Sequence, residues 1–117
     1  MVLVVDDDAE VRSVAAGILA DVGGYRIIEA GDGEEALAIL RTTPDIACLL
    51  TDVTMPRRDG ISLARAARAL DPDLRILLMT GAGMVPGLQD HRLVRKPYRA
   101  AELIAAVSSA AMRQAAE

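Results

Sequence analysis

Short runs of apolar residues alternate along this chain with longer segments in which apolar residues recur every three or four positions. Apolar runs of this length, bounded by polar or turn-forming residues, predict β-strands. The middle runs are so uniformly apolar that both faces of those strands are expected to be covered. Five strands are predicted, at residues 2–5, 25–28, 46–50, 75–79 and 92–94.

The intervening segments carry apolar residues at helical spacing and predict four amphipathic helices. The first runs from about Val11 to the glycine pair at 23–24, the second covers 33–41, the third covers 61–70, and the last continues from Leu103 toward the C-terminus. Strict alternation of strands and helices predicts a parallel sheet with helices on both faces. The segment "GAGMVPGLQDH" contains three Gly and one Pro, so a loop or a single turn is expected there instead of a regular helix.

Composition narrows the class of protein. A chain of 117 residues with 52% hydrophobic and 26% charged residues is typical of one globular domain, and we assign residues 1–117 to it. Two Tyr and no Phe or Trp predict an aliphatic core. The net charge of −4, with Arg residues interleaved among acids, argues against direct binding of nucleic acid.

The compartment is predicted from what the chain lacks. Its single cysteine, Cys48, excludes a disulfide framework and is expected to be a buried small side chain. No apolar run approaches the roughly 18 residues of a membrane span, and no secretory signal opens the chain. A cytoplasmic protein without membrane contact is therefore expected.

Polar residues stand just after the ends of four of the five predicted strands. Asp6 and Asp7 follow the first strand, Asp52 the third, Thr80 the fourth and Lys96 the fifth. In an open α/β sheet, ligands bind beyond the carboxyl ends of the strands. These side chains are therefore expected to meet at one edge of the sheet.

The residue types in this set indicate a chemistry. Carboxylates held together repel one another unless a cation lies among them, and Mg²⁺ favours carboxylates, waters and phosphate oxygens. Lys96 adds a mobile positive charge for a phosphoryl oxygen. The set is typical of phosphoryl transfer, with a carboxylate as nucleophile forming an aspartyl phosphate. Taken singly, each Asp could instead cap the following helix, and Asp8 is expected to do so.

Four segments together resemble the receiver domains of bacterial two-component response regulators. They are "VLVVDDD", "LLTDVTMPRRDG", "ILLMTG" and "VRKPY", in this order and spacing, and the resemblance covers essentially the whole chain. It implies a flavodoxin-like (βα)5 fold, doubly wound, with five parallel strands in the order 2-1-3-4-5.

The resemblance also implies a role for each matching residue. Asp52 would be the phosphoacceptor and also a Mg²⁺ ligand, Asp7 a direct Mg²⁺ ligand, Asp6 a ligand through water, and Thr54 a ligand through its backbone carbonyl. Thr80 and Lys96 would contact the phosphoryl group. The peptide bond before Pro97 would be cis, and Gly60 is expected to supply backbone freedom at the turn into the third helix.

The implied partner is a sensor histidine kinase or a phosphotransfer protein, whose phosphohistidine donates the phosphoryl group. Such a protein is not an enzyme acting on other molecules, because it catalyses only its own phosphorylation and dephosphorylation. The output is expected to be a change in protein–protein contacts. Pairing of two copies on phosphorylation is left open, as is the choice between a stand-alone regulator and the receiver module of a hybrid histidine kinase.

The chain departs from the family pattern in two places. Leu93 stands where many members carry an aromatic switch residue, and the interval from Thr80 to Lys96 is shorter than usual. The fourth helix is therefore expected to be short or replaced by a loop, which puts the usual output surface in doubt.

Three alternatives come from other classes. A nucleotide-binding enzyme would use "GAGMVPG" as a phosphate loop, but this segment does not match the dinucleotide pattern. A Mg²⁺-dependent phosphatase would need an acid where Thr54 stands. A phosphorylation-independent interaction module would not need the complete set of site residues.

Overall fold

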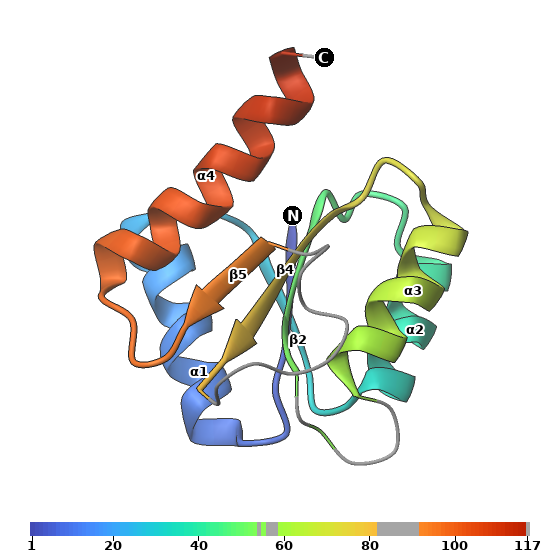
Figure 1. Ribbon diagram of the computed structural model, residues 1–117, viewed down its shortest axis with the longest axis horizontal. Helices are drawn as coiled ribbons and strands as arrows, with labels where there is room; N and C mark the ends of the chain where they lie inside the picture. The colour runs from blue at the N-terminus through green and yellow to red at the C-terminus, as the bar shows by residue number, and fades with distance from the viewer. Residues whose placement is uncertain (54, 56–58, 82–91, 117) are drawn as a thin grey trace.

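The strands form one twisted parallel sheet (Figure 1). The computed structural model describes residues 1–53, 55, 59–81 and 92–116. Within these residues the strand order is β2–β1–β3–β4–β5, and every neighbouring pair is parallel, as the family resemblance implied. The strands are β1 (Val2–Val5), β2 (Ile27–Ala30), β3 (Cys48–Asp52), β4 (Arg75–Thr80) and β5 (Arg92–Arg95).

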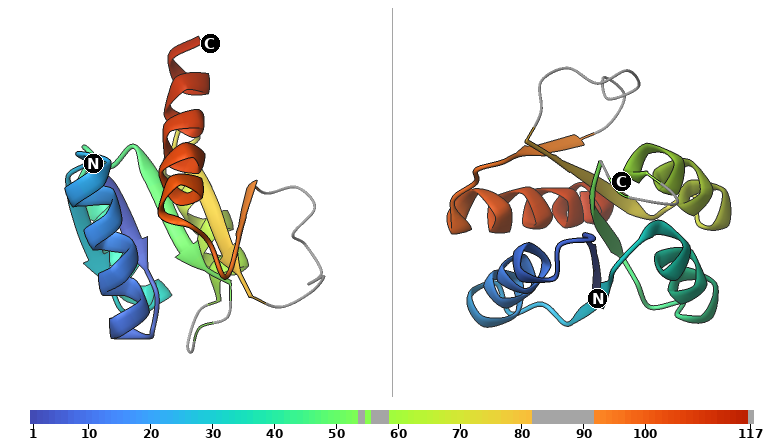
Figure 2. Two further views of the ribbon diagram at one scale, coloured as in Figure 1. Left: turned by 90° about the vertical axis from the view of Figure 1, so that its left-hand side faces the viewer. Right: turned by 90° about the horizontal axis from the view of Figure 1, so that it is seen from below.

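Helices cover both faces of the sheet (Figure 2). On one face lie α1 (Ala9–Gly17), its π-helical continuation η1 (Ile18–Val22) and α4 (Ala100–Ala116); on the other lie α2 (Gly33–Thr42) and α3 (Gly60–Leu70). The expected loop or short helix between β4 and β5 falls on residues 82–91, which lie outside the described residues. Among the residues described, no helix has both the length and the apolar character that crossing a membrane requires.

Burial along the strands follows their order in the sheet. All four residues of β1 are buried, and the central strands β3 and β4 are almost as completely covered. The edge strands β2 and β5 have one buried residue each. The two layers of core are aliphatic, as the composition predicted, with leucines as most of the largest fully buried side chains.

The second strand begins two residues later than its apolar pattern suggested. Tyr25 and Arg26 instead belong to the turn that follows η1, where Gly24 adopts a φ of 75°. The Tyr25 amide donates to the carbonyl of Leu19, and its hydroxyl lies 2.7 Å from Oγ of Ser108 in α4. Tyr25 is therefore apolar in the sequence pattern but contacts a helix instead of pairing in the sheet.

Aspartates cap three of the helices. Asp8 accepts hydrogen bonds from the amides of Glu10 and Val11 at the start of α1, as expected. Asp32 and Asp59 do the same at α2 and α3. These carboxylates are satisfied locally, which separates them from the acids discussed below.

Gly60 is required for space and not, as expected, for backbone freedom. Its φ lies outside the left-handed region, and Gly24 is the described glycine with a positive φ. A Cβ at Gly60 would overlap the carbonyl oxygen of Asp52 and lie 2.9 Å from Cα of Val53. The first residue of α3 thus packs directly on the end of β3, and its amide donates to the carbonyl of Val53 at 2.8 Å.

We expect Gly60→Ala to lower the free energy of unfolding by about 1–3 kcal/mol, because the added methyl group must displace backbone. Urea unfolding followed by circular dichroism measures this. Gly17→Ala in α1 is the matched control: its Cβ would meet nothing within 4 Å, so unchanged or slightly higher stability is expected. Equal effects of the two substitutions would contradict the steric account.

Cys48 is buried as predicted, and burial raises the pKa of its thiol from 9.0 to about 12, against a smaller opposing effect of the N-terminal charge. At pH 8 the folded protein should therefore react with a disulfide reagent about a thousandfold more slowly than the protein in urea. Because the native state holds this proton more tightly, the free energy of unfolding should fall as pH rises above 9. Rapid reaction of the folded protein would show that the thiol is accessible.

Candidate functional site

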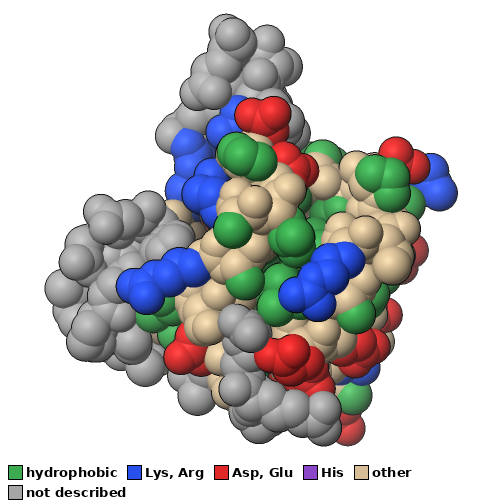
Figure 3. Space-filling view, turned by 90° about the vertical axis from the view of Figure 1, so that its right-hand side faces the viewer, with side chains coloured by type: hydrophobic (Ala, Val, Ile, Leu, Met, Phe, Trp, Pro, Cys, Tyr) green, Lys and Arg blue, Asp and Glu red, His purple; other side chains and the backbone are tan. Residues whose placement is uncertain are grey.

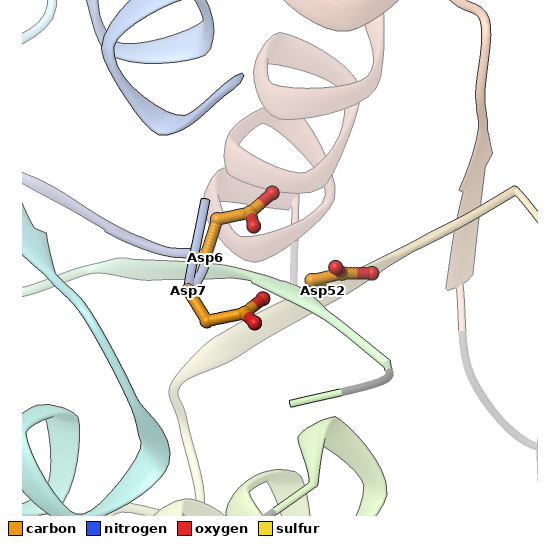
Figure 4. Close-up of side chains that lie close together, drawn as sticks. All are labelled: Asp6, Asp7 and Asp52. Carbon is orange, nitrogen blue, oxygen red and sulfur yellow. The ribbon is translucent and has the colours of Figure 1, made fainter. Parts of the chain in front are cut away.

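Three carboxylates meet at the carboxyl end of the sheet (Figure 4). Asp6 and Asp7 directly follow β1, and Asp52 is the last residue of β3. Because β1 and β3 are parallel neighbours, their ends lie side by side. One oxygen from each carboxylate falls within 4.8 Å of the others, and the side chains of Asp6 and Asp7 turn toward Asp52.

Asp6 is held on all sides and is only 1% exposed. Its amide donates to the carbonyl of Ala30 in β2 at 3.2 Å, and its Oδ1 accepts the amide of Asp8 at 3.0 Å. Its Oδ2 accepts Nζ of Lys96 at 3.2 Å, and its carbonyl oxygen accepts Nη1 of Arg12 at 2.9 Å. Asp7, by contrast, is exposed.

Lys96 supplies a positive charge to the acidic cluster. It follows β5, and its Nζ lies 3.2 Å from Oδ2 of Asp6 and 3.5 Å from Oδ2 of Asp52. Its side chain is 25% exposed, so the amine is close to solvent while it contacts both acids. The amine is thus shared between two carboxylates from different strands, as the positions of these residues after their strands predicted.

The cluster shifts the pKa values of its members. Burial raises the pKa of Asp52; Lys96 lowers it, but the charge of Asp6 raises it further, and the net shift is upward. For Lys96, burial alone would lower the pKa, and the combined attraction of Asp52 and Asp6 outweighs it and raises the pKa. Burial of Asp52 and the charge of Asp6 together therefore outweigh the effect of the Lys96 amine on the pKa of Asp52.

The remaining predicted residues lie at the same edge. Thr80 ends β4 and is buried, and its carbonyl accepts the amide of Lys96 at 2.8 Å, which ties the two residues together. The bond between Lys96 and Pro97 is cis, as the family resemblance implied. Thr54, predicted to be a metal ligand through its carbonyl, lies outside the described residues.

The donors present could hold a metal ion. The cluster offers carboxylate oxygens only, which are the ligands that hard divalent cations prefer. On the side of the molecule seen in Figure 3, several acidic side chains lie toward the lower edge and others near the top and upper right, with most Lys and Arg side chains above the lower group.

Arg12 contacts the site through the backbone carbonyl of Asp6, and Glu29 pairs with Arg12; neither residue was predicted. Arg12 lies in α1, and its Nε pairs with Oε1 of Glu29 in β2 at 3.0 Å while its Nη1 binds the Asp6 carbonyl. A single Arg in an amphipathic helix carries no sequence signal for such a role. The two residues that Arg12 contacts, Asp6 and Glu29, lie 6 and 17 positions from it in the sequence, and the fold brings them together.

Comparisons of sequence with known proteins show the family. A sequence model described as "Response regulator receiver domain" matches residues 2–108. The receiver protein CpdR of Brucella abortus (strain 2308) is 33% identical over 109 residues, which cover 88% of this chain and 89% of that protein. Response regulator MprA of Mycobacterium leprae is 37% identical over 115 residues, and the match spans 91% of this chain but 48% of that longer protein.

Solved structures lead to the same family. A CheY-like response regulator receiver domain protein from Methanospirillum hungatei JF-1 superposes with a TM-score of 0.82 at 28% identity, covering 99% of this chain and 97% of that one. Chemotaxis protein CheY4 of Vibrio cholerae gives 0.83 at 25% identity, with 93% and 96% covered. The fold, the acidic edge and these matches together establish that the chain belongs to the response regulator receiver domain family.

Proposed function

We propose that this receiver domain accepts a phosphoryl group on Asp52 in a reaction that requires Mg²⁺ at the acidic cluster. The observation that carries the proposal is the meeting of three carboxylates within 4.8 Å, with Lys96 Nζ 3.2 and 3.5 Å from two of them. Three acids around one amine leave a local negative charge that a divalent cation would balance. Asp6, Asp7 and Asp52 would hold the ion, together with the carbonyl of Thr54 that the family resemblance implies.

Asp52 is the natural nucleophile of the three. It ends a central strand whose other residues are buried, so its backbone is fixed, while its side chain remains 17% exposed and reachable by a donor. One carboxylate oxygen would attack phosphorus, and the bond from phosphorus to the donor's imidazole nitrogen would break, its electron pair staying on that nitrogen. Bound Mg²⁺ would neutralise charge on the carboxylates and on the phosphoryl oxygens.

Lys96 and Thr80 would bind the transferred group. Nζ of Lys96 already touches Asp52 and can turn from the carboxylate to a phosphoryl oxygen on the same side chain. Thr80 ends the neighbouring strand β4 and is tied to Lys96 through the backbone, so its hydroxyl is a nearby donor. Movement of these two side chains toward the new charge would alter the surrounding surface.

The donor in this proposal is a phosphohistidine of a sensor histidine kinase or a phosphotransfer protein, in the cytoplasm. The chain would catalyse only its own phosphorylation and dephosphorylation, and its output would be a changed protein–protein contact, with pairing of two copies as one form. A receiver within a hybrid histidine kinase would use the same chemistry. A phosphorylation-independent interaction module is the competing function.

We expect acetyl phosphate with Mg²⁺ to add the mass of one phosphoryl group to the intact protein. Removing Mg²⁺ with EDTA or replacing Asp52 with Asn should abolish the adduct, because the cation or the nucleophile is then missing. Intact mass spectrometry measures this. Asp32→Asn is the matched control, since that carboxylate caps α2, and its adduct should persist.

An adduct that persists in Asp52→Asn would contradict the assigned nucleophile. Absence of any adduct both with acetyl phosphate and with a phosphorylated histidine kinase, in a protein that binds Mg²⁺, would favour the interaction module.

Lys96→Met is expected to bind Mg²⁺ a few-fold more tightly than the wild type. The amine and the metal ion compete for the same carboxylates of Asp6 and Asp52, and removing the amine removes repulsion between cations. Backbone amide chemical shifts followed by NMR during a MgCl₂ titration give the dissociation constant. Weaker binding in this variant would show that the amine supports the metal site instead of competing with it.

A further inference from the structure

We propose that Arg12, anchored by Glu29, is a positioning residue that sets the geometry of the metal-binding acids by holding the backbone carbonyl of Asp6. This inference rests on the proposed Mg²⁺ site and goes beyond it, because Arg12 would touch neither the ion nor the phosphoryl group. Its guanidinium instead contacts the peptide that joins the two neighbouring acids, Asp6 and Asp7.

The guanidinium joins three elements of the fold. It extends from α1, donates through Nη1 to the Asp6 carbonyl at 2.9 Å, and pairs through Nε with Oε1 of Glu29 in β2 at 3.0 Å. It also packs on the turn after β2, since a Cβ added at Gly31 would lie 3.4 Å from Nη1. The planar guanidinium reaches the two acceptors with two different nitrogens, Nε and Nη1, held in a fixed fork, whereas an ammonium group would have to reach both from a single nitrogen.

The position of the contact explains what it controls. The amide of Asp6 and both of its carboxylate oxygens form hydrogen bonds to other residues. Arg12 binds the carbonyl, the remaining polar group of Asp6, and so completes the bonds that hold this residue in place. The carbonyl that Arg12 holds belongs to the peptide unit that continues into Asp7. Asp7 is exposed, so its backbone is the part of the residue that its neighbours can hold in place. Fixing that peptide plane fixes the position of the Asp7 Cα, from which the carboxylate reaches the cluster.

Because Arg12 is positively charged, a positioning role and a purely electrostatic role predict opposite effects on Mg²⁺ binding when Arg12 is replaced. Removing a cation beside a metal site should strengthen the binding of Mg²⁺ if only Coulomb repulsion matters. Removing a residue that orients the ligands should weaken it, typically by tenfold or more for groups that support ligands from behind. The two accounts therefore predict opposite changes for the same substitution.

The test compares the Mg²⁺ dissociation constants of wild type, Arg12→Gln, Arg12→Lys and Arg68→Gln from NMR titrations with MgCl₂ alone. All are measured at a temperature where circular dichroism shows each variant fully folded. We expect about tenfold weaker binding in Arg12→Gln. Arg12→Lys keeps the charge but not the paired contact, so binding weaker than wild type is expected there too. Arg68 lies exposed on α3 and bonds to the carbonyl of Pro72, so Arg68→Gln should match wild type.

Each result decides between accounts. Unchanged or tighter binding in Arg12→Gln overturns the positioning role, and Arg12→Lys equal to wild type overturns it if the Gln variant does not fold. If the wild type binds Mg²⁺ and Arg12→Gln binds it at least as tightly, the positioning role of Arg12 is wrong but the proposed metal site stands. A wild type that does not bind Mg²⁺ defeats the proposed metal site, and the positioning role with it.

Discussion

Repulsion among Asp6, Asp7 and Asp52 is the constraint on which the rest of the site depends. The sheet imposes it, because parallel β1 and β3 end side by side and bring one oxygen of each acid within 4.8 Å. Lys96 relieves part of this repulsion, yet the pKa of Asp52 stays above its ordinary value because burial and Asp6 outweigh the amine. The aliphatic core on both faces of the sheet supplies the stability that offsets the repulsion among the acids. The negative charge that Lys96 leaves unbalanced favours the binding of a second cation at the cluster.

Two cations contact Asp6 in different ways. Lys96 binds the carboxylate and would compete there with a metal ion in the proposed site. Arg12 binds the backbone carbonyl, where it leaves the carboxylate oxygens accessible, and is paired with Glu29. The same charge would thus have opposite consequences for metal binding at the two positions of the proposed site. The distance of each cation from the metal site would not distinguish these two roles. The roles differ because Lys96 contacts a carboxylate oxygen and Arg12 contacts a backbone carbonyl oxygen.

The sequence predicted those features that depend on the order of strands and on the residue following each one. Asp6, Asp7, Asp52, Thr80 and Lys96 come together because parallel strands present their carboxyl ends at one edge. The pattern did not predict Arg12, whose contacts join three elements, or the steric reason for Gly60, which depends on how closely α3 approaches β3. It placed the second strand two residues early because Tyr25 is apolar enough to resemble a strand residue although it packs against α4.

The most direct test of the central claim is the urea unfolding midpoint in MgCl₂ compared with NaCl at equal ionic strength. A cation that binds the native acidic cluster and not the unfolded chain must raise stability in proportion to the logarithm of its concentration. The account predicts a midpoint that rises with MgCl₂ in the wild type and does not rise in Asp52→Asn. Identical midpoints in the two salts for the wild type would contradict it.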